Sequence, residues 1–455
     1  MEKTLFKTEN LFLLICLIWG VIFLFINPPF QTPDEFEHFF KMWGFTQGTL
    51  RHQIKDGISG QVLPESFVNL YNFYDYYRRI DTKIPFKASM RANKLSLEKE
   101  KTAFLNFNPS SYTPLSYFPS FIVLWILKLL NIKPLLMMYI LRFCSLLVYL
   151  ALCYCAIKIT PCLKWTIWLF ALLPVNIYQA ASVSVDGLTF GLIILFFAYT
   201  LKLAFDENIK NIDIKKILLW GILFAYICIL KYAYFPVIVV YFLIPKEKFA
   251  SQKQYFKYLF VIAGLSVLLI AAFLSAVMST PVMNEHTKIF LINDKTDLIK
   301  QIIHSPLDYL KKVVISTYIL RGFIYRNIVS SVSVFFKMIP FFAVNLAYIA
   351  LILSVFYRTV QGQVCKINLK QKSLIIAAIL VSYLVIVTSV YLIYKSKTYI
   401  VGIQGRYLTP LLLFGLLVFV SQKKCIKNRL VPVFLFFVSQ LLLLCMFVTI
   451  IGTYV

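Results

Sequence analysis

The sequence predicts an all-α, polytopic membrane protein of about 11 to 13 transmembrane helices, which form a single integral membrane domain over residues 1–455. Hydrophobic residues make up 60% of the chain, charged residues only 15%, and the mean hydropathy is +0.77, far from the composition of a soluble domain. Apolar runs long enough to cross about 30 Å of hydrocarbon recur along nearly the whole length. We therefore expect no separate soluble domain.

The first apolar run, residues 11–26, follows Lys3 and Lys7. A secretory signal peptide would end in a small-residue cleavage site, but Asn27-Pro28-Pro29 comes next, so we expect a retained first span. The later runs are expected to supply the remaining spans. They are residues 114–131, 134–157, 164–182, 186–205, 215–232, 233–245, 255–278, 330–357, 373–394, 406–421 and 430–452.

The net charge is +26, but the basic residues are dispersed among short loops between apolar runs, which argues against nucleic acid as a partner. Loops with an excess of Lys and Arg face the cytoplasm, where they meet anionic membrane lipids. The N-terminus, with Lys3 and Lys7, is therefore predicted to be cytoplasmic. The lysine-rich loops lie at residues 202–216, 246–257, 358–372 and 423–429.

With the N-terminus inside, residues 28–113 become a large first extracytoplasmic loop. Its aromatic and basic stretch 71–79 either lies along the membrane interface or stacks on sugar rings. Both alternatives place this stretch at the outer membrane surface.

The two ways of counting spans disagree about Asp186. Counting backward from the C-terminus places residues 279–329, residues 395–405 and Asp186 outside, whereas counting forward through three spans places Asp186 inside. We prefer the backward count because it depends on several lysine clusters. It requires that one run between 114 and 182 does not cross fully, and Pro174 favours a break in the third.

The nine cysteines lie mostly within apolar runs, and none is in the 28–113 loop. Their positions show no zinc-type spacing. We therefore expect neither a disulfide framework nor a metal site built on cysteine.

Three carboxylates and a histidine lie within five residues at the end of the first run, in Asp34-Glu35-Phe36-Glu37-His38. Thr32-Pro33-Asp34-Glu35 also fits a helix start, with Thr32 as N-cap and Glu35 closing a capping box. Capping explains neither Asp34 nor His38, which lie one turn apart on such a helix. Asp34, Glu35 and His38 are therefore the catalytic candidates, with Asp34 as a general base toward a hydroxyl; a solvated loop acid is the alternative.

Asp186 is flanked closely on both sides by apolar runs. An ionisable group at a membrane boundary is costly unless it faces a polar partner, which makes Asp186 a substrate-binding candidate. The alternative is an N-cap acid that starts the 187–205 helix. The sequence identifies no cofactor with certainty; the candidate is a divalent cation such as Mg²⁺ or Mn²⁺, with Asp34 and Asp186 as its ligands if the site holds one.

Candidates for binding an anion lie later in the chain. Arg406 ends a span with Gly405 beside it to allow close approach, and its planar fork suits a phosphate. Lys231, at an outward turn, adds a second charge, and Gln404 and Tyr407 flank Arg406 in the same substrate-binding set. The alternative for both cations is snorkelling to lipid headgroups.

Four motifs together resemble a family of multispanning bacterial membrane proteins of mostly unassigned function, which is similar to the GT-C glycosyltransferases. The likeness covers nearly the whole chain, and it depends on the order and spacing of the motifs. They are Pro33-Asp34-Glu35 followed by His38, Tyr112-x-Pro114-Leu115-x-Tyr117, Ser182-x-Ser184-x-Asp186-Gly187, and Gln404-Gly405-Arg406-Tyr407-Leu408-x-Pro410.

The resemblance implies a GT-C-like fold in the bacterial cytoplasmic (inner) membrane and an enzyme that takes a sugar from a polyprenyl-phosphate carrier. The acceptor would be a cell-envelope glycan or a lipid-linked molecule at the outer face. Asp34 matches the catalytic base, Asp186 a second acid, and Arg406 the residue that holds the carrier phosphate, with Lys231 a looser match.

Two other classes remain open. A lipid-linked glycan transporter or flippase would show charges midway through several spans, whereas Arg142 and Lys337 are the exceptions in nearly uncharged runs. A non-catalytic envelope-assembly protein would not need Asp34, Asp186 and Arg406 to converge. The distances among these three residues discriminate between the last class and an enzyme.

Overall fold

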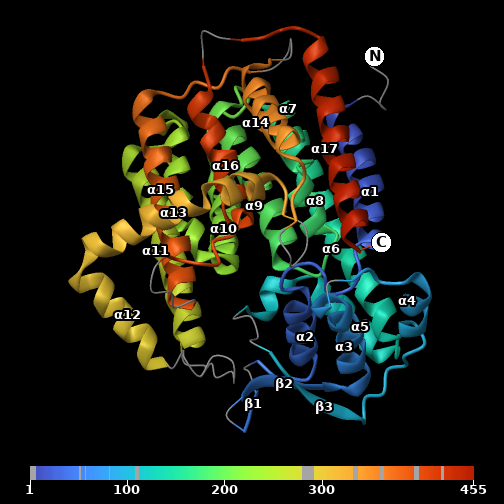
Figure 1. Ribbon diagram of the computed structural model, residues 1–455. Coiled ribbons are helices and arrows are strands. Elements are labelled where there is room, and N and C mark those ends of the chain that lie inside the picture. The colour runs from blue at the N-terminus through green and yellow to red at the C-terminus, as the bar shows by residue number, and fades with distance from the viewer. Residues whose placement is uncertain are drawn as a thin grey trace.

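The computed structural model describes residues 7–50, 53–56, 58–80, 82–107, 112–278, 292–331, 337–358, 363–393, 399–421 and 425–454. Within them, most of the chain forms helices that run side by side in one bundle, with a small sheet at one end (Figure 1). Six helices in this part of the chain are long and apolar enough to cross a membrane, which confirms an all-α polytopic membrane protein. They are α1 (Thr8–Ile26), α6 (Pro134–Ile159), α9 (Val185–Phe205), α11 (Gln252–Met278), α15 (Leu369–Ile393) and α17 (Leu430–Tyr454). The total of about 11 to 13 spans stays a prediction.

Shorter helical segments complete the bundle, and α6 packs against both α1 and α9 at its centre. One further helix, α12 (Ile292–His304), projects from the bundle beside α13 (Figure 1). The shorter segments are α7 (Lys164–Ala171), α8 (Pro174–Ala180), α10 (Ile214–Leu230), η3 (Tyr232–Leu243), η4 (Lys246–Lys248), α14 (Phe341–Phe356), η6 (Gly405–Tyr407), α16 (Thr409–Gly415) and η7 (Leu416–Phe419). The bundle also includes α13 (Pro306–Val329), which is long but less apolar.

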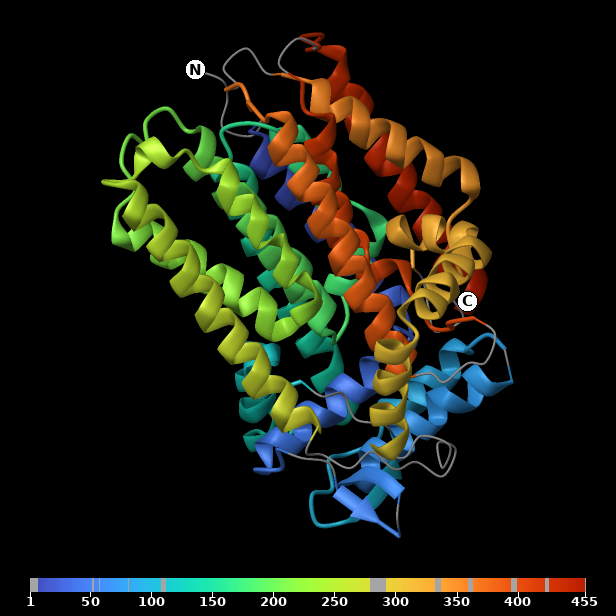
Figure 2. The same ribbon diagram turned by 90° about the vertical axis from the view of Figure 1, so that its left-hand side faces the viewer.

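The described parts of the lysine-rich loops, which exclude residues 359–362 and 422–424, lie at one end of the bundle, as the backward count expects. Figures 1 and 2 place the start of α1 at the same end, opposite the sheet. Lys3, residues 279–291 and residues 394–398 belong to the predicted topology but lie outside the described residues. Hydrogen bonds connect these loops, among them Ile212 N to Lys248 O (2.7 Å), Arg358 N to Ile426 O (3.0 Å) and Gln371 Nε2 to Phe242 O (2.8 Å).

The expected span 114–131 does not cross the bundle. It consists of the short turn η2 (Pro114–Tyr117) and α5 (Ser120–Leu129), whose 10 residues reach only about 15 Å at 1.5 Å per residue. The run 164–182 is broken at Pro174 into α7 and α8, as expected, but it still leads from the lysine-rich end to the start of α9. The short α5 therefore removes the conflict between the two counts and places Asp186 at the end opposite the lysines.

Residues 28–113 form a folded layer rather than an open loop. It contains α2 (Glu35–Thr46), α3 (Glu65–Arg79), α4 (Phe86–Ala92) and an antiparallel sheet in the order β1 (Gln53–Lys55), β2 (Ile58–Pro64), β3 (Thr102–Asn106). Aromatic rings fill its core, and Phe30 lies against both Phe40 and Tyr71. Tyr71 and Tyr74 of the aromatic stretch are buried in this core, while Tyr76 is 58% exposed. The aromatic stretch therefore serves chiefly to build this layer.

The expectation that the cysteines form no disulfide is wrong for one pair. Cys162, between α6 and α7, is bonded to Cys365, between α14 and α15, at the lysine-rich end. The two residues are 203 positions apart, so only the folded topology brings them together. Disulfides persist in oxidising compartments, whereas lysine-rich loops face the cytoplasm, so the two rules assign this end to opposite sides. We follow the charge rule because four separate loops at this end carry an excess of Lys and Arg, whereas a single disulfide supports the other assignment.

Labelling of Cys425 tests this orientation. Cys425 is a free, exposed cysteine in the lysine-rich loop before α17. We expect a membrane-impermeant maleimide to label it in inverted vesicles and not in intact cells, with Cys425→Ser as the blank. A cysteine in place of Glu98, which is 52% exposed in the opposite layer, should show the reverse pattern. Labelling of Cys425 in intact cells would show that the protein has the opposite orientation in the membrane.

Candidate functional site

A buried ion pair between Glu35 and Arg142 fixes the start of α2 against α6. Both side chains are fully buried, and Arg142 donates from Nε to Glu35 Oε1 (2.8 Å) and from Nη2 to Oε2 (2.7 Å). Its remaining N–H groups donate to the carbonyls of Leu24 (2.9 Å), Asn27 (2.6 Å) and Pro28 (3.1 Å). Each donor of the guanidinium thus has an acceptor, as a buried charge requires.

Glu35 completes its own set of hydrogen bonds with two backbone amides. Its carboxylate accepts from Phe30 N (3.0 Å) and from Val183 N (3.0 Å), just before α9. The structure favours a positioning role for Glu35 over the predicted catalytic role, because both of its carboxylate oxygens are occupied in a buried network. Glu35 is a positioning residue that joins the turn before α2 to the turn before α9.

The predicted capping box is also wrong. The helix begins at Glu35, with Asp34 as the preceding residue at φ +64°, and the Thr32 hydroxyl accepts from Asn27 Nδ2 (2.7 Å) instead of capping. The reason is that Arg142 binds the Glu35 carboxylate that the box needs. Asp tolerates the left-handed region better than most residues, yet a non-glycine residue there often marks a functional site.

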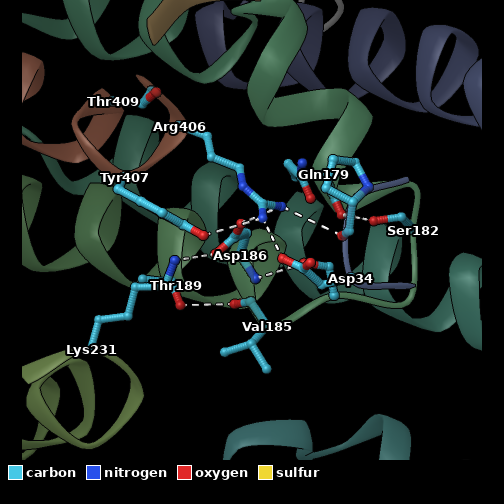
Figure 3. A network of polar contacts seen from close by, with 12 residues as sticks. Asp34, Gln179, Ser182, Val185, Asp186, Thr189, Lys231, Arg406, Tyr407 and Thr409 are labelled. Carbon is cyan, nitrogen blue, oxygen red and sulfur yellow. Dashed lines mark hydrogen bonds and ion pairs between the residues drawn. The ribbon is translucent and has the colours of Figure 1, made fainter. Parts of the chain in front are cut away.

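Asp34, Arg406, Asp186 and Lys231 form one network of ion pairs (Figure 3). The Arg406 guanidinium donates from Nη2 to Asp34 Oδ2 and lies 3.2 Å from Asp186 Oδ2 through Nη1, and Lys231 Nζ donates to Asp186 Oδ1. The Arg406 side chain is 1% exposed and Asp186 6%, but Asp34 is 42% exposed. The structure thus brings together the three residues whose convergence the sequence left open, and only one of the carboxylates is open to a ligand.

A close approach of two backbones places Arg406. Gly405 N donates to Asn327 Oδ1 of α13 (2.7 Å), and Thr409 Oγ1 donates to Ile328 O (2.7 Å). A Cβ on Gly405 would lie 2.5 Å from the backbone of Asn327 and Ile328. This confirms that the glycine beside Arg406 permits close approach.

Asp186 is the second residue of α9 and is not its N-cap. Ser184 is the N-cap, and its hydroxyl accepts from Asp186 N (3.0 Å). The Asp186 carboxylate is therefore free to bind Lys231 and Arg406. A Cβ on Gly187 would lie 2.8 Å from Ala180 Cα, so glycine also allows α9 to start close to α8.

The remaining predicted residues surround this network. Tyr407 Oη accepts from Arg406 Nη2 (3.4 Å), and Lys231 Nζ lies 4.6 Å from the centre of the Tyr407 ring. His38 is buried, with Nδ1 2.9 Å from Tyr117 Oη. Gln404 directly precedes Arg406, and its Oε1 is buried without a partner among the described residues.

Burial lowers the pKa of His38 to about 4. The charges of Asp34 and Asp186 oppose this shift, and those of Arg406 and Lys231 add to it. The imidazole is therefore neutral at pH 7 and available as a hydrogen-bond donor or acceptor.

Two residues of this region were not singled out from the sequence. Gln179 of α8 is drawn with the network in Figure 3, and neither atom of its buried amide has a partner in the described part of the chain. Arg142 was noted only as an exception to the uncharged runs. An ionisable residue in the middle of an apolar run signals a buried partner, and this rule would have identified it.

A pocket adjoins the network. Its walls combine serine hydroxyls with apolar side chains, and Tyr117 and Ser184 connect it to His38 and to the start of α9. The space inside is only about 20 Å³, which is room for a single water molecule. The lining includes Ser116, Tyr117, Ser120, Ser145, Val183 and Ser184.

The carboxylates are poorly arranged for a divalent cation. Arg406 contacts both Asp34 and Asp186, so its guanidinium lies where a shared ion would have to bind. Within the described ranges, no group of three or more His, Cys, Asp or Glu side chains gathers as metal ligands would.

A family model described as "Predicted membrane protein (DUF2142)" matches residues 17–415, and the chain therefore belongs to this family of membrane proteins. No curated protein matches the chain, and no solved structure matches it either.

Substitution of Gly405 tests the close approach that places Arg406. Gly405→Ala is expected to lower the stability by about 1 to 3 kcal/mol, because the new methyl group meets rigid backbone. Gly415→Ala is the matched control, since a Cβ there meets only Ile379 Cδ1 at 3.7 Å. Thermal unfolding in detergent measures both, and equal melting temperatures for the two variants would contradict the role of Gly405.

The pH dependence of stability tests the burial of neutral His38. Its pKa is about 4 in the folded chain and about 6.5 in the unfolded chain, so the unfolded chain binds more protons between these values. The stabilising contribution is complete above pH 6.5 and is lost as the pH falls toward 4. His38→Gln should therefore flatten the fall in melting temperature between pH 7 and pH 4.5, while His304→Gln, on the exposed end of α12, should keep it. If the melting temperature of His38→Gln falls with pH as steeply as that of wild type, this account is refuted.

Proposed function

We propose that this member of the DUF2142 family is an inverting glycosyltransferase. It would move a sugar from a polyprenyl-phosphate carrier to a cell-envelope glycan or lipid-linked acceptor at the outer face of the bacterial cytoplasmic membrane. The observation that carries the proposal is the contact between the Asp34 carboxylate and the Arg406 guanidinium, which come from opposite ends of the chain. The proposed base, Asp34, and the residue proposed to bind the carrier phosphate, Arg406, are thereby in direct contact.

The position of the network supports a membrane-bound substrate. Asp186, Lys231 and Arg406 lie where α9, α10 and η6 begin or end, at the end of the bundle opposite the lysine-rich loops. A polyprenyl carrier keeps its tail in the hydrocarbon and its phosphate at this level. The arrangement of the four motifs, which resembles that of the GT-C enzymes, supports the same substrate class.

In the mechanism we propose, the Asp34 carboxylate takes the proton of an acceptor hydroxyl. The hydroxyl oxygen forms a bond to the anomeric carbon while the bond from that carbon to the phosphate oxygen breaks, with inversion. The electron pair of the broken bond stays on the leaving polyprenyl phosphate, whose charge Arg406 and Lys231 stabilise. The protonated Asp34 later releases its proton to water.

The other residues have supporting roles in this scheme. Tyr407 lies under Lys231 and beside Arg406, and Gln404 contributes an amide at the same turn. Neutral His38 faces the same network. No step is assigned to Mg²⁺ or Mn²⁺, since Arg406 lies between Asp34 and Asp186.

Sugar transfer by the reconstituted protein tests the proposal. With a panel of radiolabelled polyprenyl-phosphate sugars and envelope acceptors, Asp34→Asn should lower kcat by about 10²- to 10⁴-fold, the usual worth of a general base. Asparagine tolerates the left-handed backbone at this position, so the fold should persist. Arg406→Ala should abolish transfer, and Arg406→Lys should retain the charge but bind the donor less well.

Asp213→Asn is the control, because Asp213 caps α10 at the lysine-rich end and asparagine caps equally well. The assignment is wrong if Asp34→Asn and Arg406→Ala both leave transfer intact. Movement of the labelled lipid between leaflets without transfer would favour the transporter.

A further inference from the structure

We propose that Asp34, the base, balances the charge of Arg406 until the donor binds, and that a singly charged phosphodiester headgroup opens the site by displacing Asp34 from Arg406. This inference rests on the proposed function and adds a charge requirement for the donor and an order of binding. It identifies Asp34 as both the competitor of the donor phosphate and the base that this phosphate releases.

The charges of the network balance without a ligand. Two carboxylates, Asp34 and Asp186, face two cations, Lys231 and Arg406. Because the Arg406 side chain is 1% exposed, an extra unbalanced charge here would be costly. A ligand that adds a negative charge must therefore replace one that is already present.

Asp34 is the carboxylate that can leave. Asp186 is buried and binds both cations, whereas Asp34 is 42% exposed and, among the described residues, pairs with Arg406 alone. An ion pair with one exposed partner contributes little stability. Asp34 also precedes α2 in a left-handed conformation, so its side chain is not held in a helix turn.

Arg406 has an unused donor for the incoming group. Its Nε–H is buried without an acceptor in the described part of the chain, while Nη2 on the same edge binds Asp34. A phosphate presents two oxygens that match both donors of a guanidinium edge.

Charge matching then selects the donor. A phosphodiester carries one negative charge and replaces the one charge of Asp34, so the network stays neutral. A diphosphate link adds at least one more charge, which Lys231 and Arg406 cannot balance while Asp186 remains bound to them. The site is therefore built for a sugar on a monophosphate carrier, and donor must bind before Asp34 can accept a proton from the acceptor.

Binding of a decaprenyl-phosphate hexose, a phosphodiester with one charge, and of the corresponding decaprenyl-diphosphate hexose to the purified full chain tests this inference; they are here called the monophosphate and the diphosphate. Asp34→Asn should bind the monophosphate about tenfold more tightly than wild type, the change expected when one weak competing ion pair is removed. Asp34→Gly, which also tolerates the backbone conformation, should show the same gain. Wild type should prefer the monophosphate to the diphosphate.

Glu37→Gln is the matched control on the same helix. Among the described residues Glu37 forms no ion pair with Arg406 or Lys231, so its replacement should leave the affinity unchanged. If wild type binds the monophosphate and neither Asp34 variant binds it more tightly, displacement is overturned and the proposed function stands. If wild type binds the diphosphate more tightly than the monophosphate, the charge matching is overturned. No binding of either lipid by any variant overturns both proposals.

Discussion

The buried pair of Glu35 and Arg142 is the interaction on which the site depends. It joins the last turn of α1, the first turn of α2, the middle of α6 and the turn before α9 through charge-assisted hydrogen bonds. Removing either partner would leave an uncompensated buried charge, which typically costs about 3 to 5 kcal/mol. The pair thus fixes the geometry of the site. The residue that precedes Glu35, Asp34, carries the exposed carboxylate of the network.

The two carboxylates of the candidate site are placed by this constraint. Asp34 directly precedes Glu35, and Asp186 follows Val183, whose amide binds Glu35, by three residues. Neither carboxylate is needed for a helix cap, because Ser184 caps α9 and Asp34 binds Arg406 through its side chain. A rigid, fully bonded pair therefore supports a second network in which one carboxylate is exposed, which is how a membrane protein can keep a usable base beside hydrocarbon.

The sequence predicted the class of fold and the components of the site because these depend on local signals. Apolar runs identified the bundle, lysine clusters placed Asp186 opposite the basic loops, and Gly405 beside Arg406 indicated close approach. The roles of Glu35 and Arg142 were not predicted, since they are 107 residues apart and no local pattern joins them. For the same reason Cys162 and Cys365 were missed, and the run 114–131 looked long enough to cross until η2 and α5 proved to divide it.

The central claim is that Asp34 is the base of a sugar transfer at the outer face of the membrane. The most direct measurement is the surface glycan profile of a strain that lacks this gene, compared with the same strain carrying wild type or Asp34→Asn at equal membrane abundance. The account predicts that one sugar is absent from the deletion strain, is restored by wild type, and stays absent with Asp34→Asn. Full restoration by Asp34→Asn would contradict it.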